Sequence, residues 1–349
     1  MNDIPPQPLH GTHTTAYATA CPNDGIAGTG RACRDALPCG ISTGDITALI
    51  RQASHEGMRE ITLPDIADKT GSAQSASSTG AQVMSAFAID PIIADLSHLY
   101  TPTPTPQGNA LPLPGNPQNQ ARLVAPEFLR QEKLRLLRAV FDEKGEATVK
   151  SQPFKAFLAD NSKWLVPHAQ YSYLCDAYGT SRFEEWPNHR EWCDADMVQL
   201  ANPRTKAYKK LLFYYYTQYI MHTQMKAVAT LAADLGVALC CETETGIGRH
   251  ACDVWRDSGM FLLYNNAGVA TDTSVAAHPY AHIYGYVEHD YESEATQWWH
   301  ARIDRMGEYF TRVRIAATPC CDGGAMRLAN IAVPKAAPPI SLADGNICR

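Results

Sequence analysis

The segment from residue 205 to residue 255 constrains the fold of this chain more than any other. Between Thr205 and Leu235 apolar side chains recur with helical spacing, and Gly236 marks the end of that helix. A short apolar run from Val237 to Leu239 predicts a strand, and a polar loop follows it. A helix, a glycine, a buried strand and a polar loop in this order form one unit of an α/β enzyme fold.

The same order occurs twice more along the chain. Residues 45–57 predict an amphipathic helix that stops at Gly57, and residues 59–64 (REITLP) predict a short buried strand. Residues 293–310 predict a further amphipathic helix, and residues 312–315 (RVRI) begin a strand. This rhythm is typical of a β/α barrel or of a doubly wound sheet.

Composition narrows the classes of partner. The chain has 349 residues, 45% of them apolar, and a net charge of −6, so we expect a sizeable core but no binding of nucleic acid or of an anionic membrane. The N-terminus shows no signal-peptide pattern, and no apolar run approaches the length of a membrane span. Eleven cysteines without a C-x-x-C pair favour free thiols in a reducing cytoplasm.

The pattern changes along the chain and predicts six regions. Residues 101–117 are dense in proline, which favours a stiff connector, and helices are expected at 126–145, 151–160 and 164–179. The expected regions are an irregular or disordered N-terminus (1–40), the first barrel strands (41–100), the proline-rich connector (101–117), a helical insertion (118–204), central barrel units (205–316) and an irregular tail (317–349).

Five ordered segments resemble the 4-α-glucanotransferases, the amylomaltases and disproportionating enzymes of glycoside hydrolase family 77. They are GDITALIRQASHEGM, SAFAIDPIIADLSHL, KSQPFKAFLADNSKWLVPHAQYSYLCDAYGT, FYYYTQYIMHTQM and TQWWHARIDRMGEYFTRVRI. The resemblance implies a TIM-type (β/α)8 barrel with helical insertions, here partial, and transfer of α-1,4-glucan segments by a retaining double displacement. It implies α-1,4-glucans or maltooligosaccharides as partners, with no cofactor and no metal, and leaves the oligomeric state open.

The resemblance places Ala316 where the family has its nucleophile. The family reads RIDH at the end of a barrel strand, whereas this chain reads Arg314-Ile315-Ala316-Ala317. Retaining transfer needs two carboxyl groups about 5–5.5 Å apart, and alanine supplies neither. We also expect the chain to stop before the strands that carry the acid/base residue, so an inactive, glucan-binding relative is the alternative. Glu242, at the family's KGD motif, is a weak candidate for a substitute carboxylate.

Five residues are candidates for binding the sugar, and three of them have a structural alternative. Arg314 could instead form a salt bridge, Trp255 could pack in the core, and Asp272 could be a solvated loop residue. Asp65 and Asp68 flank the family's strand-end Asn-Asp with a shifted register, so neither placement is secure. The candidates for substrate binding are Arg314, Asp253, Trp255, Asp272 and Asp65.

Two other clusters have a functional and a structural interpretation. His278 and His282, together with His250 and Cys252, could suggest zinc, but Pro279 argues against a helix there and no second ligand pair has the proper spacing. The aromatic runs could stack on sugars, but on amphipathic helices such runs are more often core. They are Tyr214-Tyr215-Tyr216 and Trp298-Trp299.

Overall fold

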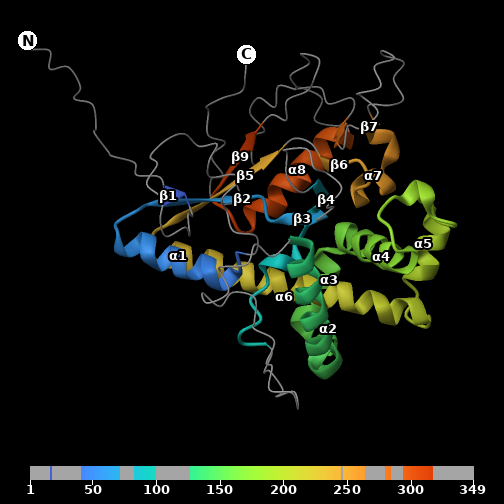
Figure 1. The fold of residues 1–349 in the computed structure, drawn as a ribbon, viewed down its shortest axis with the longest axis horizontal. Coiled ribbons are helices and arrows are strands. Elements are labelled where there is room, and N and C mark those ends of the chain that lie inside the picture. The colour runs from blue at the N-terminus through green and yellow to red at the C-terminus, as the bar shows by residue number, and fades with distance from the viewer. Residues whose placement is uncertain are drawn as a thin grey trace, which may run out of the picture.

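A four-stranded parallel sheet organises the molecule (Figure 1). The computed structural model describes residues 16–17, 41–70, 82–99, 126–244, 247–263, 280–283 and 294–316. The strands of this sheet, in spatial order, are β1 (Ala16–Tyr17), β2 (Glu60–Pro64), β5 (Ala238–Glu244) and β9 (Arg312–Ala316). The three strands predicted from the sequence are therefore neighbours and parallel, as a β/α fold requires.

A helix precedes each of these three strands, and its ends follow from local sequence. The three helices are α1 (Thr43–His55) before β2, α6 (Lys206–Asp234) before β5 and α8 (Glu294–Gly307) before β9. The Ser42 and Asp45 side chains cap the start of α1 reciprocally, and the Thr205 hydroxyl accepts the Tyr208 N–H at the start of α6. Gly236, with φ +67°, turns the chain from α6 into β5. The predicted boundaries of α1 and α6 hold within about two residues, and α8 ends three residues before its predicted end at 310.

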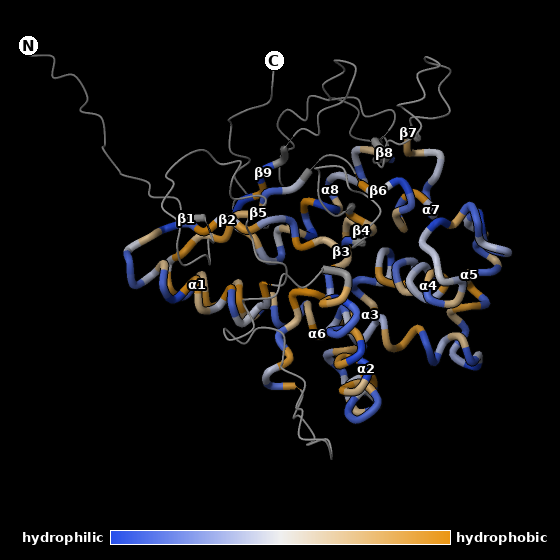
Figure 2. The backbone as a smooth tube through the Cα atoms, viewed as in Figure 1, coloured by the Kyte–Doolittle hydropathy of each residue, from blue (hydrophilic) through white to orange (hydrophobic). Residues whose placement is uncertain are grey.

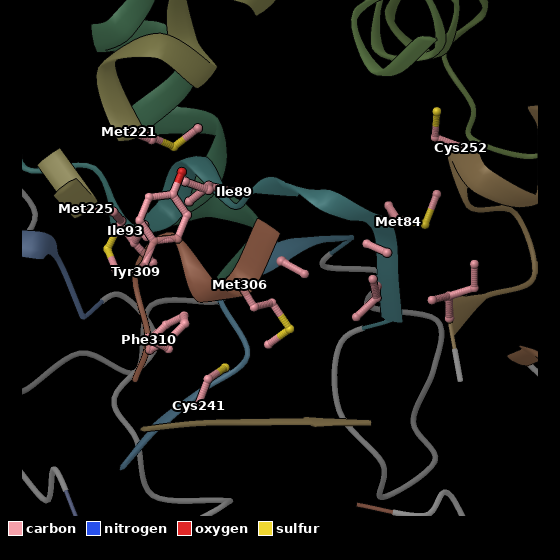
Figure 3. Close-up of a cluster of buried hydrophobic side chains, with 14 of the residues drawn as sticks. Met84, Ile89, Ile93, Met221, Met225, Cys241, Cys252, Met306, Tyr309 and Phe310 are labelled. Atoms are coloured by element: carbon pink, nitrogen blue, oxygen red, sulfur yellow. The ribbon is translucent and has the colours of Figure 1, made fainter. Parts of the chain in front are cut away.

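Alternate residues of the sheet face the helices and form the core. Ile61 and Leu63 of β2, Cys241 of β5 and Val313 of β9 are buried. Figure 3 shows part of this core. Its labelled side chains include Met221 and Met225 of α6, Met306 of α8, and Tyr309 and Phe310 of the turn after α8. In Figure 2 the tube is orange along much of β2, as burial of that strand requires.

Four helices lie between β4 (Gln82–Ile89) and α6 in the described part of the sequence. They are α2 (Pro126–Lys150), α3 (Gln152–Asp160), α4 (Ser162–Tyr178) and α5 (Asp194–Leu200), and Figure 1 shows them on the side of the molecule away from β1. The three predicted helices are present. The first continues five residues past its predicted end at 145, through Gly145, because a single glycine weakens a helix without stopping it.

Two small antiparallel sheets and four short helical turns make up the rest of the described elements. The sheets contain β3 (Ala67–Thr70) with β4 (Gln82–Ile89), and β6 (Ile247–Gly248) with β8 (Tyr280–Ile283) and β7 (Phe261–Leu263). The turns are η1 (Pro91–Ile93), η3 (Phe183–Glu185), α7 (Cys252–Arg256) and η4 (Ser258–Met260).

Among the described residues of the range 41–100, where the first barrel strands are expected, only β2 joins the parallel sheet. The apolar run at 82–89 pairs antiparallel with β3 instead. An apolar run shows that a strand will be buried, but not which strand it will pair with.

None of the helices in the described ranges is both long enough and apolar enough to cross a bilayer.

Candidate active site at the carboxyl ends of the parallel strands

The carboxyl ends of β2, β5 and β9 lie side by side. Pro64, Glu242 and Arg314 occupy one row of the sheet as consecutive Cα partners. Two positions further along, Glu244 is the partner of Ala316. In parallel α/β sheets and barrels this edge is where ligands bind and chemistry occurs. The position aligned with the family's nucleophile therefore lies at the expected edge of the sheet.

The register adds a residue that the sequence interpretation missed. Glu242, the weak candidate for a substitute carboxylate, is the partner of Arg314, two positions before Ala316. Glu244 is the direct partner of Ala316. The signal was present in the sequence as a Glu-Thr-Glu run, since residues two apart share one face of a strand. Only the pairing of β5 with β9 shows which glutamate lies beside position 316.

Asp65, directly after β2, is engaged by protein groups. Its carboxylate lies 3.1 Å from Nη2 of Arg302, accepts the hydroxyl hydrogen of Thr243, and accepts the N–H of Ala67 at 2.8 Å. Burial alone would raise the pKa of Asp65, but Arg302, Lys69 and these hydrogen bonds outweigh it and lower the pKa. Asp65 is therefore an ionised carboxylate that joins the ends of β2 and β5.

Arg302 on α8 holds this junction together, and the sequence interpretation did not identify it. Its side chain is fully buried and lies against the rings of Trp298 and Trp299, with its guanidinium carbon 5.6 and 5.1 Å from their centroids. Its Nη2 donates to Thr243 at 2.7 Å. An arginine four residues after a core tryptophan, on the apolar face of an amphipathic helix, was the available signal for a buried ionic partner.

Asp253 is a second buried carboxylate near this region. It lies on α7, and its carboxylate accepts the N–H of Ala86 at 3.0 Å and the indole N–H of Trp298 at 3.2 Å. Burial raises the pKa of Asp253, and the two hydrogen bonds and the charge of Arg302 offset part of that shift. These contacts link α7, β4 and α8 behind the strand ends.

Trp255 lies in an aromatic core. It is 2% exposed, its indole N–H donates to the carbonyl of His189 at 2.8 Å, and its ring meets those of Trp186 and Trp192 edge-on. This geometry agrees with the core alternative for Trp255. The aromatic runs also pack internally, as predicted, with Tyr215, Tyr216, Trp298 and Trp299 buried.

Arg314 and Glu242 are only partly buried, whereas Arg302 and Thr243, the partners of Asp65, are fully buried. Two residues earlier on β9, Arg312 pairs with Glu60 of β2. The strand ends thus carry two kinds of polar residue: a buried set that positions the strands, and a half-buried row that is accessible to a ligand.

The remaining predicted residues lie elsewhere or outside the described ranges. Asp68 is on β3 and pairs with Arg130 at 2.9 Å, away from the strand ends. His250 lies 3.4 Å from Glu184, and Cys252 is buried. Asp272 and His278 fall outside the described residues, as does the side chain of His282. Within the described ranges no three His, Cys, Asp or Glu side chains are grouped to hold a metal ion.

Comparison with known proteins shows which family the chain matches. A family model described as 4-alpha-glucanotransferase, glycoside hydrolase family 77, matches residues 35–316. The 4-alpha-glucanotransferase DPE2 of Oryza sativa subsp. japonica is 27% identical over 186 residues, which cover 52% of this chain and 19% of the rice protein.

A solved structure, the amylomaltase from Streptococcus agalactiae in complex with acarbose, matches with a TM-score of 0.56 at 18% identity. The match covers 80% of this chain and 56% of that enzyme. The likeness supports a TIM-barrel-like α/β fold, and the chain spans only part of the length of both relatives. On the family match, which includes β2, β5 and β9, this chain belongs to glycoside hydrolase family 77, the 4-alpha-glucanotransferases.

Proposed function

We propose that this chain acts in α-glucan metabolism as a 4-alpha-glucanotransferase-type protein. Its ligands are α-1,4-glucans such as maltodextrin, starch or glycogen, and it binds them at the carboxyl ends of β2, β5 and β9. The observation that carries this proposal is the coincidence of the family match over residues 35–316 with three adjacent parallel strand ends. Half-buried polar groups at such an edge suit the hydroxyls of a neutral sugar chain.

The proposed sugar-binding residues divide into two roles. Arg314 contacts the glucan directly, because it is half-buried in the row with Glu242. Asp65, Asp253 and Trp255 act from behind the strand ends, because their side chains are satisfied by protein partners. Asp272 joins the direct set on the strength of the sequence resemblance.

A second function, glucan binding without transfer, is favoured by the residue at position 316. The retaining mechanism forms a covalent bond between a carboxylate and the anomeric carbon, and alanine has no such group. Removal of a covalent nucleophile usually lowers the rate by several orders of magnitude. Glu242 and Glu244 on the adjacent strand are the nearest carboxyl-bearing residues by register.

Incubation of the chain with maltotriose, followed by chromatography of the products, separates the two functions. Release of glucose together with longer maltooligosaccharides at ~1–10³ turnovers per second would establish transfer. Maltooligosaccharide binding by calorimetry without turnover would establish the binding function. Absence of both would overturn the proposal.

We also propose the finer architecture and location. The parallel sheet is one part of a barrel that ordinarily has eight strands, with residues 118–204 as its helical insertion and 101–117 as the connector. The five described cysteines are free, which supports a reducing cytoplasm. Limited proteolysis that cuts first within 101–117 would support the connector.

A further inference from the structure

Strand β5 loses its neighbour on one side at the point where the proposed sugar-binding row of Glu242 and Arg314 begins. Its pairing with β2 ends at Pro64 and Glu242, whereas its pairing with β9 continues for two more residues, to Glu244 and Ala316. Beyond Pro64 the chain turns into β3, which belongs to a different sheet. The last two residues of β5 are therefore not held by backbone pairing with β2.

Side chains take over from the backbone at this level. The hydroxyl of Thr243 accepts a hydrogen bond from Nη2 of Arg302 at 2.7 Å and donates its own hydrogen to the Asp65 carboxylate. The same Nη2 lies 3.1 Å from that carboxylate, which closes a triangle of three polar groups. This Asp65 junction joins α8, β5 and the residue that follows β2.

Burial makes the Asp65 junction stiff. Thr243 is 1% exposed and Arg302 is 0% exposed, and the guanidinium of Arg302 is packed against the rings of Trp298 and Trp299. Water cannot replace hydrogen bonds in such a place, so a group that loses its partner there is costly. The three side chains therefore keep one arrangement.

The position of Thr243 also determines the position of its neighbour. Consecutive residues of a strand point to opposite faces of the sheet. Thr243 points toward α8, because it meets Arg302, and Glu242 points to the other face, in the row with Arg314. The two residues share a peptide bond, so a shift of Thr243 would displace Glu242. The buried face of the sheet thus sets the geometry of the half-buried face.

We infer that Arg302 and Thr243 are positioning residues of the strand-end site, which fix the end of β5 and with it the alignment of Glu242 and Arg314 toward the sugar. Neither positioning residue contacts the sugar, because both are buried behind the sheet. This inference rests on the proposed function and adds to it the residues that align the row.

Titration calorimetry of the full chain with maltotriose tests the inference. Thr243→Val keeps the shape and the β-branched side chain but removes the hydroxyl, so the junction loses its centre. The affinity for maltotriose should fall about threefold to tenfold, which corresponds to one lost hydrogen bond. Thr243→Ser retains the hydroxyl and should bind maltotriose like the parent chain.

The matched control is Thr217→Val on α6. Thr217 is 3% exposed, and its hydroxyl donates to the carbonyl of Phe213 at 2.9 Å. The control therefore loses a buried threonine hydroxyl in the same way, and urea denaturation should show a comparable loss of stability. It should bind maltotriose like the parent chain, because Thr217 lies away from the strand ends. Should Thr243→Val fail to fold, Thr243→Ala removes the same hydroxyl without adding a methyl group beside Asp65 and should show the same loss of affinity.

The outcomes separate this inference from the proposed function. If the parent chain binds maltotriose and the variant without the Thr243 hydroxyl binds it equally well, the positioning role is overturned and the proposed function stands. An equal loss of affinity in Thr217→Val, or in Thr243→Ser, would also overturn the positioning role, because the loss would then not depend on the hydroxyl at the strand end. Failure of the parent chain to bind maltotriose would overturn the proposed binding, and the positioning role with it.

Discussion

The strand ends and helix α2 each have an arginine with acidic partners, and the two clusters differ in the number of carboxylates per arginine. At the strand ends Arg302 has one carboxylate, Asp65, at 3.1 Å. On α2, Arg130 lies between two carboxylates, Asp68 and Asp90. Arg302 is fully buried, whereas the Arg130 side chain keeps 20% of its exposure.

This difference sets the sign of the pKa shifts. The pKa of Asp65 is lowered, because Arg302, Lys69 and the hydrogen bonds from Thr243 and Ala67 together outweigh the effect of burial, with no second carboxylate opposing them. Burial, and then the negative charge of Asp68, raise the pKa of Asp90 to about 6 although Arg130 opposes them. The number of carboxylates per guanidinium, rather than burial alone, thus decides whether a buried acid stabilises the fold at neutral pH.

The largest effect is expected from Arg302→Met. Methionine would keep much of the packing against Trp298 and Trp299 but leave Asp65 buried without its cation. Breaking a buried pair in this way costs about 3–5 kcal/mol of unfolding free energy, which urea denaturation measures.

The control for Arg302→Met is Arg135→Met, which breaks a solvent-accessible pair with Glu132. It should cost no more than about 1 kcal/mol. Equal losses in the two variants would show that the Asp65 junction is not a special feature of the strand ends.

Asp90→Asn is expected to have a smaller effect on the unfolding free energy, of opposite sign to that of Arg302→Met. In the folded chain Asp90 holds its proton up to about pH 6, whereas its ordinary pKa is 3.8. The unfolded chain therefore releases this proton first, and the contribution of Asp90 to the stability of the parent protein falls as the pH rises from about 4 to about 6. The amide of the variant does not titrate, so that fall should shrink by about 1–3 kcal/mol.

Urea unfolding at pH 4.5 and pH 7 measures this change. The corresponding Asp65→Asn variant should behave in the opposite way. The folded pKa of Asp65 is lowered, so its stabilisation is present at neutral pH and is lost as the pH falls through that pKa. The same pH profile in both variants would refute the stoichiometry argument.

The smallest expected effect is on the affinity for the ligand. Arg314→Ala should weaken maltooligosaccharide binding about tenfold, because a charge-assisted hydrogen bond to the sugar is lost. Arg312→Ala is the matched control, since Arg312 lies two residues earlier on β9 and pairs with Glu60 instead. Calorimetric affinities that fall equally in both variants would remove Arg314 from the site.

Much of the fold follows from local patterns that the sequence carries openly. The starts of α1 and α6 are determined by Ser42 and Thr205, and the end of α6 by Gly236, because capping and left-handed turns depend on a few adjacent residues. The family resemblance then located Ala316. The antiparallel pairing of β4 with β3 was not predicted, because pairing depends on distant residues.

The sequence by itself determined the helix–glycine–strand units, the family and the residue at the nucleophile position. Only the tertiary structure decided that Asp65 belongs to Arg302, that Trp255 is core, and that Glu244 rather than Glu242 is the partner of Ala316. The physical reason is the distance along the sequence over which each interaction acts. Helical caps and periodicity act over a few residues, whereas ion pairs and strand register join residues far apart in the chain, such as Asp65 and Arg302, which meet only when the core closes between them.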